Sequence, residues 1–318
     1  MRVIPASFEI LEDLDQQNLI TRIEVCGRVC YKSEDKISTE SGGPFVKGII
    51  RHGHNSVMEM GVLTLKVSGA NEKDVALLYS TIPKYLFIDQ MADYLLLTGS
   101  VRAFREMILF HGQVKIVAAI GDFLLDRHPL MFDDLTSSFA TGSASEISVA
   151  KVGLQEVDQF ENSLLARHRH IAVKFFVNRA ITHEIVRHRP CSYLQESQRY
   201  CRYSESKFDS QVTFIKPMFF DENSDEYLLW EKAMEETEAI YLKLLATASP
   251  QAARTVLPNS CKTELIAYAN LVEWHHIFKL RTAAGAEPSM REIMNPLLAR
   301  FQQRFPGVFD DLGSGKKP

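Results

Sequence analysis

The residues best suited to chemistry lie in one polar stretch, residues 187–200, which reads RHRPCSYLQESQRY. A guanidinium group presents a planar fork of donors that matches the oxygens of a phosphate, and this stretch groups three arginines. Ser197 and Gln198 add neutral donors and acceptors of the kind that bind a base or a sugar. The pattern therefore indicates a site for a small phosphate-bearing ligand.

An Arg-His-Arg triplet by itself is more often a solvated basic loop than a site, and the chain provides a comparison. Residues 167–169 form the same triplet, but after seven residues it reaches Val177, with no Ser or Arg-Tyr. We interpret this first copy as ordinary surface charge. The apolar spacing of residues 177–186 predicts a helix that delivers Arg187 near its end, so the second copy is expected at a helix-to-loop junction.

Two further groups of side chains have both a structural and a functional interpretation. In residues 51–59, RHGHNSVME, His52 and His54 could share a metal ion, but Glu59 alone is a weak further ligand and a polar turn is at least as favoured. Cys26 and Cys30 are four residues apart on one face of a predicted helix, where two small buried thiols are favoured over a metal or redox pair. No metal site is therefore predicted.

Residues 187–200 resemble the signature of the flavin-dependent thymidylate synthase family: Arg-His-Arg, seven residues, then Ser, closely followed by Arg-Tyr. Residues 51–59 are similar to a second block of that family and residues 253–281 to a third, in the family's order. The resemblance covers roughly residues 1–70 and 171–310. The chain departs from it at Leu194 and Gln195, where many members have Asn and Glu, and at Gly285, where many have His.

The resemblance implies roles for individual residues. Arg281 would be catalytic, beside the pyrimidine, where a cation stabilises developing negative charge. The cofactor-binding positions would be His54, Ser56, Arg187, His188, Arg189, Gln195, Asn270 and His276. The substrate-binding positions would be Glu184, Arg187, Gln195, Glu196, Ser197, Gln198, Arg199, Arg254 and Arg281. No cysteine nucleophile is implied, and Cys191 and Cys201 are interpreted as structural.

The implied reaction is the reductive methylation of dUMP to dTMP, with FAD as cofactor and NADPH and methylenetetrahydrofolate as co-substrates, in a homotetramer. If a reduced flavin supplies the hydride, the protein need only align the reactants and stabilise charge, for which arginines, amides and hydroxyls suffice. Two alternatives stay open. One is a flavin-dependent C5 methylase or hydroxymethylase of another uridine nucleotide, and the other is a non-catalytic flavin- or nucleotide-binding homologue.

Composition limits the remaining possibilities. The net charge of −4 over 318 residues argues against a protein that binds nucleic-acid polymers, which is usually basic. No apolar run reaches the roughly 18 residues that span a bilayer, and the first residues lack the apolar core of a signal peptide. Five cysteines, an odd number, fit reduced thiols. A cytoplasmic protein without a membrane partner is expected.

The fold expected around these motifs is α+β: a single flavin-dependent thymidylate synthase-like domain over residues 1–318. Members of the family pass almost directly from the region near residue 70 to the helix before Arg187. Residues 70–170 are therefore predicted to be an insertion, with a hairpin of strands at 85–89 and 94–98 followed by helices. Packing against a neighbouring subunit and roofing the site are both open as its role.

Apolar spacing and turn residues predict the other elements. Strands are expected at 63–67 and 212–215, and helices at 16–31, 44–50, 101–109, 114–125, 227–247 and 290–305. The helix at 227–247 is predicted to bury Leu229, Ala233, Ile240, Leu244 and Leu245. Residues 253–258 are expected to lead into an apolar helix that runs through Asn270 and Phe278. A mobile loop is expected at 136–148 and a disordered tail after Gly313.

Overall fold

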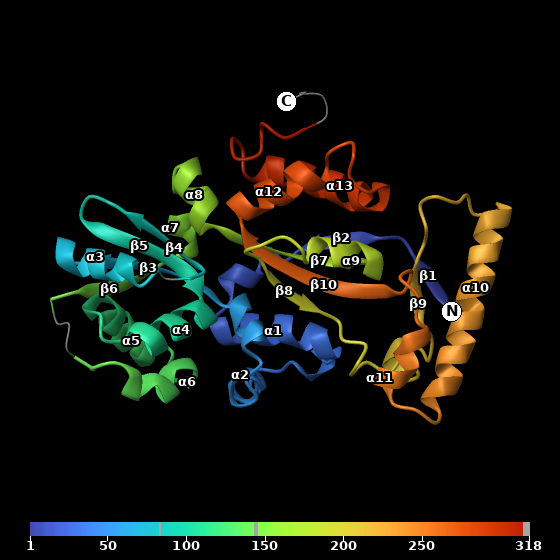
Figure 1. The fold of residues 1–318 in the computed structure, drawn as a ribbon, viewed down its shortest axis with the longest axis horizontal. Coiled ribbons are helices and arrows are strands. Elements are labelled where there is room, and N and C mark those ends of the chain that lie inside the picture. The colour runs from blue at the N-terminus through green and yellow to red at the C-terminus, as the bar shows by residue number, and fades with distance from the viewer. Residues whose placement is uncertain (83, 143–145, 314–318) are drawn as a thin grey trace.

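The structure, a computed structural model, describes residues 1–82, 84–142 and 146–313. In this part of the chain the strands form three sheets with helices packed around them (Figure 1). This mixture of largely antiparallel sheets and helices confirms the predicted α+β class. Residues 143–145 of the predicted mobile loop and the tail after Gly313 lie outside the described residues. Among the described helices, none has the length and apolar character needed to cross a membrane.

The central sheet is antiparallel throughout, in the order β2 (Ser7–Ile10), β7 (His170–Asn178), β10 (Lys262–Asn270) and β8 (Ser192–Gln195). β10 lies between two partners and is buried along almost its whole length. The prediction of a helix through Asn270 is wrong at this point, because α12 (Leu271–Arg281) begins one residue later with Asn270 as its N-cap. A strand that is buried on both faces is apolar at consecutive positions, so its pattern cannot be told from that of a buried helix.

Helices cover both faces of the central sheet (Figure 1). On one face, α12 packs with α13 (Pro288–Arg304) around the fully buried rings of Trp274, Phe278 and Phe301. On the other face lie α1 (Leu19–Tyr31) and α2 (Gly42–Arg51).

The predicted helix at 177–186 begins later than expected, as α9 (Arg179–Ile185). Val177 and Asn178 complete β7 instead, and the Asn178 side chain caps the helix by accepting a hydrogen bond from the Ile181 amide. Such an N-cap satisfies one of the free amides of the first helical turn. α9 still delivers Arg187 just beyond its end, as predicted.

The second sheet has the order β4 (Leu86–Gln90), β5 (Tyr94–Ser100), β3 (Val62–Ser68) and β6 (Ser148–Val152). The predicted hairpin is confirmed, and Ser100 caps α4 (Val101–His111) by accepting from the Ala103 amide. The other helices of this region are α3 (Glu72–Ser80), α5 (Lys115–Arg127), α6 (Pro129–Phe132), α7 (Leu154–Val157) and α8 (Asn162–His168). Residues 70–170 thus extend the sheet of β3, and they share one apolar core with α1 and α2. Their status as an insertion relative to the family stays a prediction.

A third unit lies at the opposite end of the molecule from the second sheet (Figure 1). There β1 (Arg2–Ile4) pairs in parallel with β9 (Thr213–Ile215), beside α10 (Asp225–Leu245) and α11 (Pro250–Ala253). The predicted inner face of this long helix is largely wrong, since Leu229 is 70% exposed and Ile240 is 51% exposed. The residues that α10 buries are Tyr227, Met234, Tyr241 and Leu245.

The error in α10 is a choice between two apolar stripes on one helix. Leu229 and Tyr227 are two positions apart, which places them about 200° from each other around the axis. The sequence pattern favoured the aliphatic stripe, whereas the structure buries the tyrosines, whose rings cover more apolar area. Tyr241 packs against Tyr203, with ring centroids 5.7 Å apart. Tyr203, which follows the 187–200 motif in the chain, therefore helps to determine which face of α10 is buried.

Candidate functional site

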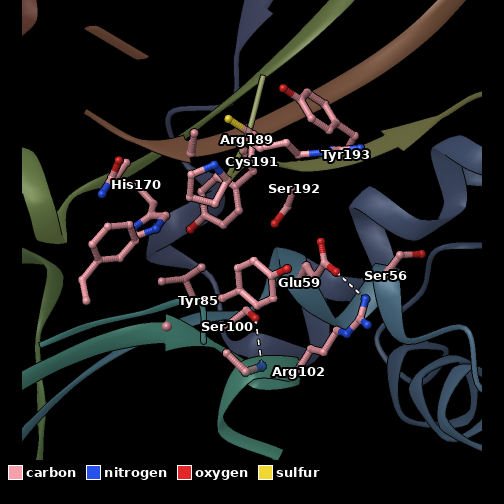
Figure 2. A pocket seen from close by; sticks show the side chains of 18 of the residues that line it. Ser56, Glu59, Tyr85, Ser100, Arg102, His170, Arg189, Cys191, Ser192 and Tyr193 are labelled. Atoms are coloured by element: carbon pink, nitrogen blue, oxygen red, sulfur yellow. Dashed lines mark hydrogen bonds and ion pairs between the residues drawn. The ribbon is translucent and has the colours of Figure 1, made fainter. Parts of the chain in front are cut away.

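A cavity of about 630 Å³, here called the inter-sheet cavity, lies between the central sheet and the second sheet. Side chains from both sides converge on it (Figure 2). The predicted site residues that line it are Ser56, Arg189, Gln195 and Asn270. The structure therefore brings together positions from all three sequence blocks, 51–59, 187–200 and 253–281.

The two amides at this cavity are held by internal partners. Gln195, the last residue of β8, donates from Nε2 to the hydroxyls of Thr182 at 3.0 Å and Thr263 at 3.2 Å. The Oδ1 atom of Asn270 accepts from the Glu273 amide at 3.0 Å as the cap of α12. These bonds fix how both side chains face the cavity. Arg189 is exposed, with its guanidinium 5.6 Å from the centre of the Tyr193 ring, and supplies a positive charge at the wall.

A second group of predicted residues, here called the Arg281 cluster, meets around the guanidinium of Arg281. Its Nε donates to Nε2 of His188 at 2.9 Å, and its Nη1 donates to Oε2 of Glu184 at 2.6 Å. The His188 ring contacts the His276 ring, with centroids 5.7 Å apart. Among the described residues, none of these four lines the inter-sheet cavity. The cluster joins the end of α9 to the end of α12.

The electrostatics of the Arg281 cluster keep His188 neutral. Burial, then the positive charge of Arg281 and the neighbouring His276, lower the pKa of His188 to about 4 from its ordinary 6.5. An unprotonated Nε2 can accept the hydrogen bond from Arg281, whereas a protonated ring would place two donors face to face. The arrangement therefore fixes the direction of this bond near neutral pH.

We expect acidification to destabilise the protein through His188. The unfolded chain takes up a proton on this residue below pH 6.5, but the folded chain does so only near pH 4, so stability falls as the pH falls through that window. The loss at this site is about 2–3 kcal/mol. The variant His188→Gln should show a correspondingly weaker pH dependence of the free energy of unfolding between pH 6.5 and 4. A profile parallel to that of the control variant His183→Gln, at an exposed position of α9, would contradict this assignment.

Three predicted substrate residues present their charge at the surface. Within the described part of the chain, no hydrogen bond or ion pair engages the guanidinium of Arg187 or of Arg254. Arg199 is exposed and lies 5.6 Å from the centre of the Tyr200 ring. These guanidinium groups are available to an anionic ligand.

Other predicted substrate residues are engaged inside the protein. Glu196 is buried and accepts hydrogen bonds from the Tyr203 hydroxyl at 2.8 Å and from Nζ of Lys262 at 2.9 Å. Gln198 is also buried, and its Nε2 lies 3.5 Å from Sγ of Cys261. The amide of Ser197 donates to the Cys30 carbonyl at 2.9 Å, which fastens the motif to α1.

Beneath the motif lies a buried ionic group, here called the Glu264 network. Glu264 is paired with Lys32 at 2.9 Å, Lys174 at 2.7 Å and Lys262 at 2.6 Å. Lys262 also binds Glu196, so the network joins the end of α1 and the strands β7 and β10 to the motif. Burial alone would raise the pKa of Glu264, but the three ammonium groups outweigh it and hold the pKa at about 2.

Residues 51–59 lead from the end of α2 through a turn into a 3-10 helix at Asn55–Met60, which buries Val57 and Met58. Nδ1 of His52, the C-cap of α2, lies 2.7 Å from the Gly48 carbonyl oxygen. Nδ1 of His54 lies 3.2 Å from the Tyr31 hydroxyl, and the Tyr31 ring meets the Tyr200 ring at 5.3 Å. Across the described residues, no group of three or more His, Cys, Asp or Glu side chains is arranged to hold a metal ion.

The thiols are poorly suited to nucleophilic chemistry. Burial raises the pKa of Cys30 and of Cys191 to about 11, and that of Cys201 and of Cys261 to about 12. Burial also raises the pKa of Cys26. Because the thiolate is the nucleophilic form, these groups are unreactive near neutral pH. This agrees with the structural interpretation of Cys26, Cys30, Cys191 and Cys201.

The interpretation of residues 167–169 as surface charge is wrong for two of the three positions. His168 and Arg169 are each only 2% exposed. Arg169 donates to Asp15 and to Asp158 at 2.6 Å each, and Nε2 of His168 lies 2.8 Å from Asp89. Asp15 lies 154 positions from Arg169, and Asp89 lies 79 positions from His168. The local sequence therefore gives no sign of these partners.

The side chains that residues 70–170 bring to the inter-sheet cavity are not among the predicted site residues. In Figure 2, Tyr85, Ser100 and Arg102 lie opposite Arg189, Cys191 and Tyr193. The missed lining residues of this region are Tyr85, Phe87, Gly99, Ser100, Arg102, Ala103, Glu106 and His170. Only the open alternative that this region roofs the site pointed to them, since the predicted family resemblance covers roughly residues 1–70 and 171–310 and therefore implied no roles for residues between them.

Comparison with known proteins places this site in context. Residues 160–307 match the sequence model of a family described as thymidylate synthase complementing protein. The flavin-dependent thymidylate synthase of Pyrococcus furiosus is 35% identical over 128 residues, which cover 40% of this chain and 52% of that protein. The enzyme of the same name from Clostridium tetani is 26% identical over 201 residues, covering 52% of this chain and 78% of that protein.

These matches confirm the predicted resemblance to the flavin-dependent thymidylate synthase family. The matched family region contains β7, α9, the 187–200 motif, β10 and α12. The chain spans about half the length of the Pyrococcus relative it matches. A solved structure, the UMP/dUMP methylase PolB from Streptomyces cacaoi bound with 5-Br dUMP, aligns over 98% of this chain and 96% of its own with 13% identity and a TM-score of 0.41.

Proposed function

We propose that the chain is a flavin-dependent thymidylate synthase, which converts dUMP to dTMP with FAD, NADPH and methylenetetrahydrofolate and works as a homotetramer. The observation that carries the proposal is the inter-sheet cavity, on which Ser56, Arg189 and Asn270 converge from three separate sequence blocks. The match of residues 160–307 to the family supports it independently. Neither support depends on a reactive cysteine.

The side chains around the cavity fit a flavin. Arg189 supplies a positive charge for a pyrophosphate, and Ser56 and Gln195 supply hydroxyl and amide groups that suit a sugar or a ring edge. When bound, the reduced flavin supplies the hydride that the methylation needs. The residues of this chain would hold and orient the reactants.

The surroundings of the other arginines suit them to different roles. Arg187, Arg199 and Arg254 present exposed or partly exposed guanidinium groups, which suit the phosphate of a nucleotide. Glu184 and His188 hold Arg281 in a fixed orientation. A group that stabilises charge developing on a pyrimidine ring must be fixed in this way. A homotetramer would allow surface arginines of one subunit to complete the site of another.

Binding of dUMP tests the phosphate assignment. We expect Arg254→Ala to raise the dissociation constant of dUMP about tenfold to a hundredfold, because a hydrogen bond to a charged group contributes about 1.5–3 kcal/mol. The measurement is a titration of the flavin absorbance of the FAD-loaded protein with dUMP, and then with UMP. The control is Arg300→Ala at an exposed position of α13, which should leave the constant unchanged. Equal dUMP affinity in both variants would contradict the role of Arg254, and a preference for UMP would favour the other-nucleotide alternative.

A further inference from the structure

The wall that residues 70–170 contribute to the inter-sheet cavity is aromatic. Tyr85 is 67% exposed although it is a large ring, and Phe87 beside it is half-buried. The Phe87 ring meets the His170 ring edge to face at 6.0 Å, and His170 meets Tyr268 at 5.6 Å. All four residues line the cavity, so a row of rings runs from the hairpin to the central sheet.

The backbone presents Tyr85 in a conformation that bulky residues rarely adopt. Its φ angle is +60°, in the left-handed region, where a side chain with a Cβ is disfavoured. The chain packs closely on Gly99 at this point: a Cβ on Gly99 would collide with the Leu86 side chain and lie 3.3 Å from the Tyr85 carbonyl oxygen. Residues held in such conformations concentrate at ligand sites.

This wall is tied firmly to the rest of the site. Arg102 of α4 binds Glu59 at 2.7 Å, and the Val101 amide donates to the Gly61 carbonyl at 2.7 Å, which joins the wall to the block that contains Ser56. On the other side, Asp89 of β4 binds His168 at 2.8 Å. The hairpin is therefore held in place at both ends of the cavity.

The charges of the wall select the kind of group that it can bind. Its cation, Arg102, is engaged by both Glu59 and Glu106 at 2.7 Å, so its charge is more than balanced by carboxylates. Burial lowers the pKa of His170 to about 4, so that ring is neutral at neutral pH. A phosphate gains nothing from such a wall, whereas the face of a flat ring system gains contact with aromatic side chains.

We propose that residues 70–170 supply Tyr85 and Phe87 as the stacking surface for a planar, nitrogen-rich heteroaromatic ring bound in the inter-sheet cavity. The inference rests on the proposed function, which offers two such rings, the isoalloxazine of FAD and the pterin of the folate. It assigns a role in ligand recognition to a region that the family resemblance does not cover.

The test compares ligand affinities of variants of this wall. In Tyr85→Ala and in the double variant with Phe87→Ala, the dissociation constant of one of the two ligands should rise about tenfold to a hundredfold. FAD is followed by quenching of its fluorescence, and methylenetetrahydrofolate by its effect on the flavin spectrum under anaerobic conditions. Tyr85→Phe should retain the affinity, because it keeps the ring. The ligand whose affinity falls in these variants identifies which ring, isoalloxazine or pterin, stacks on Tyr85 and Phe87.

The matched control is Phe110→Ala, an aromatic residue of the same region that is 66% exposed on α4 and is not part of the described lining. It should bind both ligands as the wild-type chain does. Unchanged affinities in the Tyr85 and Phe87 variants, with a wild-type chain that binds both ligands, would overturn this inference alone. A wild-type chain that binds neither ligand would overturn the proposed function together with the inference.

Discussion

Replacing Arg281 by lysine is expected to reduce the rate of dTMP formation by about a hundredfold to a thousandfold. Lysine keeps the positive charge but lacks the planar fork with which Arg281 binds His188 and Glu184 at the same time. The charge would therefore lose the fixed orientation on which its proposed role beside the pyrimidine ring depends. The measurement is a single-turnover assay that starts from reduced enzyme, dUMP and methylenetetrahydrofolate.

The control for this prediction is Arg300→Lys, the same exchange at an exposed position of α13. Flavin content and melting temperature should be close to those of the wild-type chain in both variants, so that a lower rate reports chemistry and not folding. A rate in Arg281→Lys within a factor of about three of the wild type would correspond to a change of only about 0.7 kcal/mol in activation free energy and would contradict the role assigned to Arg281.

Replacing Glu264 by glutamine should destabilise the fold by about 3–5 kcal/mol. The carboxylate is 5% exposed and is paired with Lys32, Lys174 and Lys262, and its loss leaves three largely buried ammonium groups with too little negative charge. The control is Glu222→Gln, which breaks an exposed pair with Lys216 and should leave stability unchanged. Chemical denaturation of both variants measures the difference.

The pH dependence of stability provides a second measurement of the same network. Because the folded pKa of Glu264 is about 2 and the ordinary value is 4.5, its contribution is complete above pH 4.5 and is lost as the pH falls toward 2. The glutamine variant should lack this part of the acid destabilisation. A variant as stable as the wild type at pH 7 would show that the three lysines do not depend on Glu264.

Much of the fold follows from local patterns. The cap at Ser100, the hairpin of β4 and β5, and the long helices α10 and α13 all have local signals, namely a cap residue, an alternating run or an apolar stripe. The predictions are wrong where a partner from a distant part of the chain determines which residues are buried. β10 is buried because it lies between β7 and β8, and α10 turns its tyrosines inward because Tyr203 lies beneath Tyr241.

The site divides in the same way. The resemblance to the family pointed to the blocks that supply Ser56, Arg189 and Asn270, because such a signature depends on residue type and spacing within a block. It could not identify Tyr85 and Phe87, whose importance depends on how a hairpin folds over another sheet. The expectation of surface charge was also wrong for His168 and Arg169, whose buried side chains are paired with Asp89, Asp158 and Asp15 from other segments.

The most direct test of the proposed function is an anaerobic assay of the purified chain, loaded with FAD and reduced with NADPH, to which dUMP and methylenetetrahydrofolate are added. The proposed function predicts that the flavin is reoxidised and that dTMP forms in proportion to it. Reoxidation with a hydroxymethyl product, or turnover of UMP alone, would move the assignment to a related uridine-modifying enzyme. A protein that takes up no FAD and forms no dTMP would contradict the proposed function.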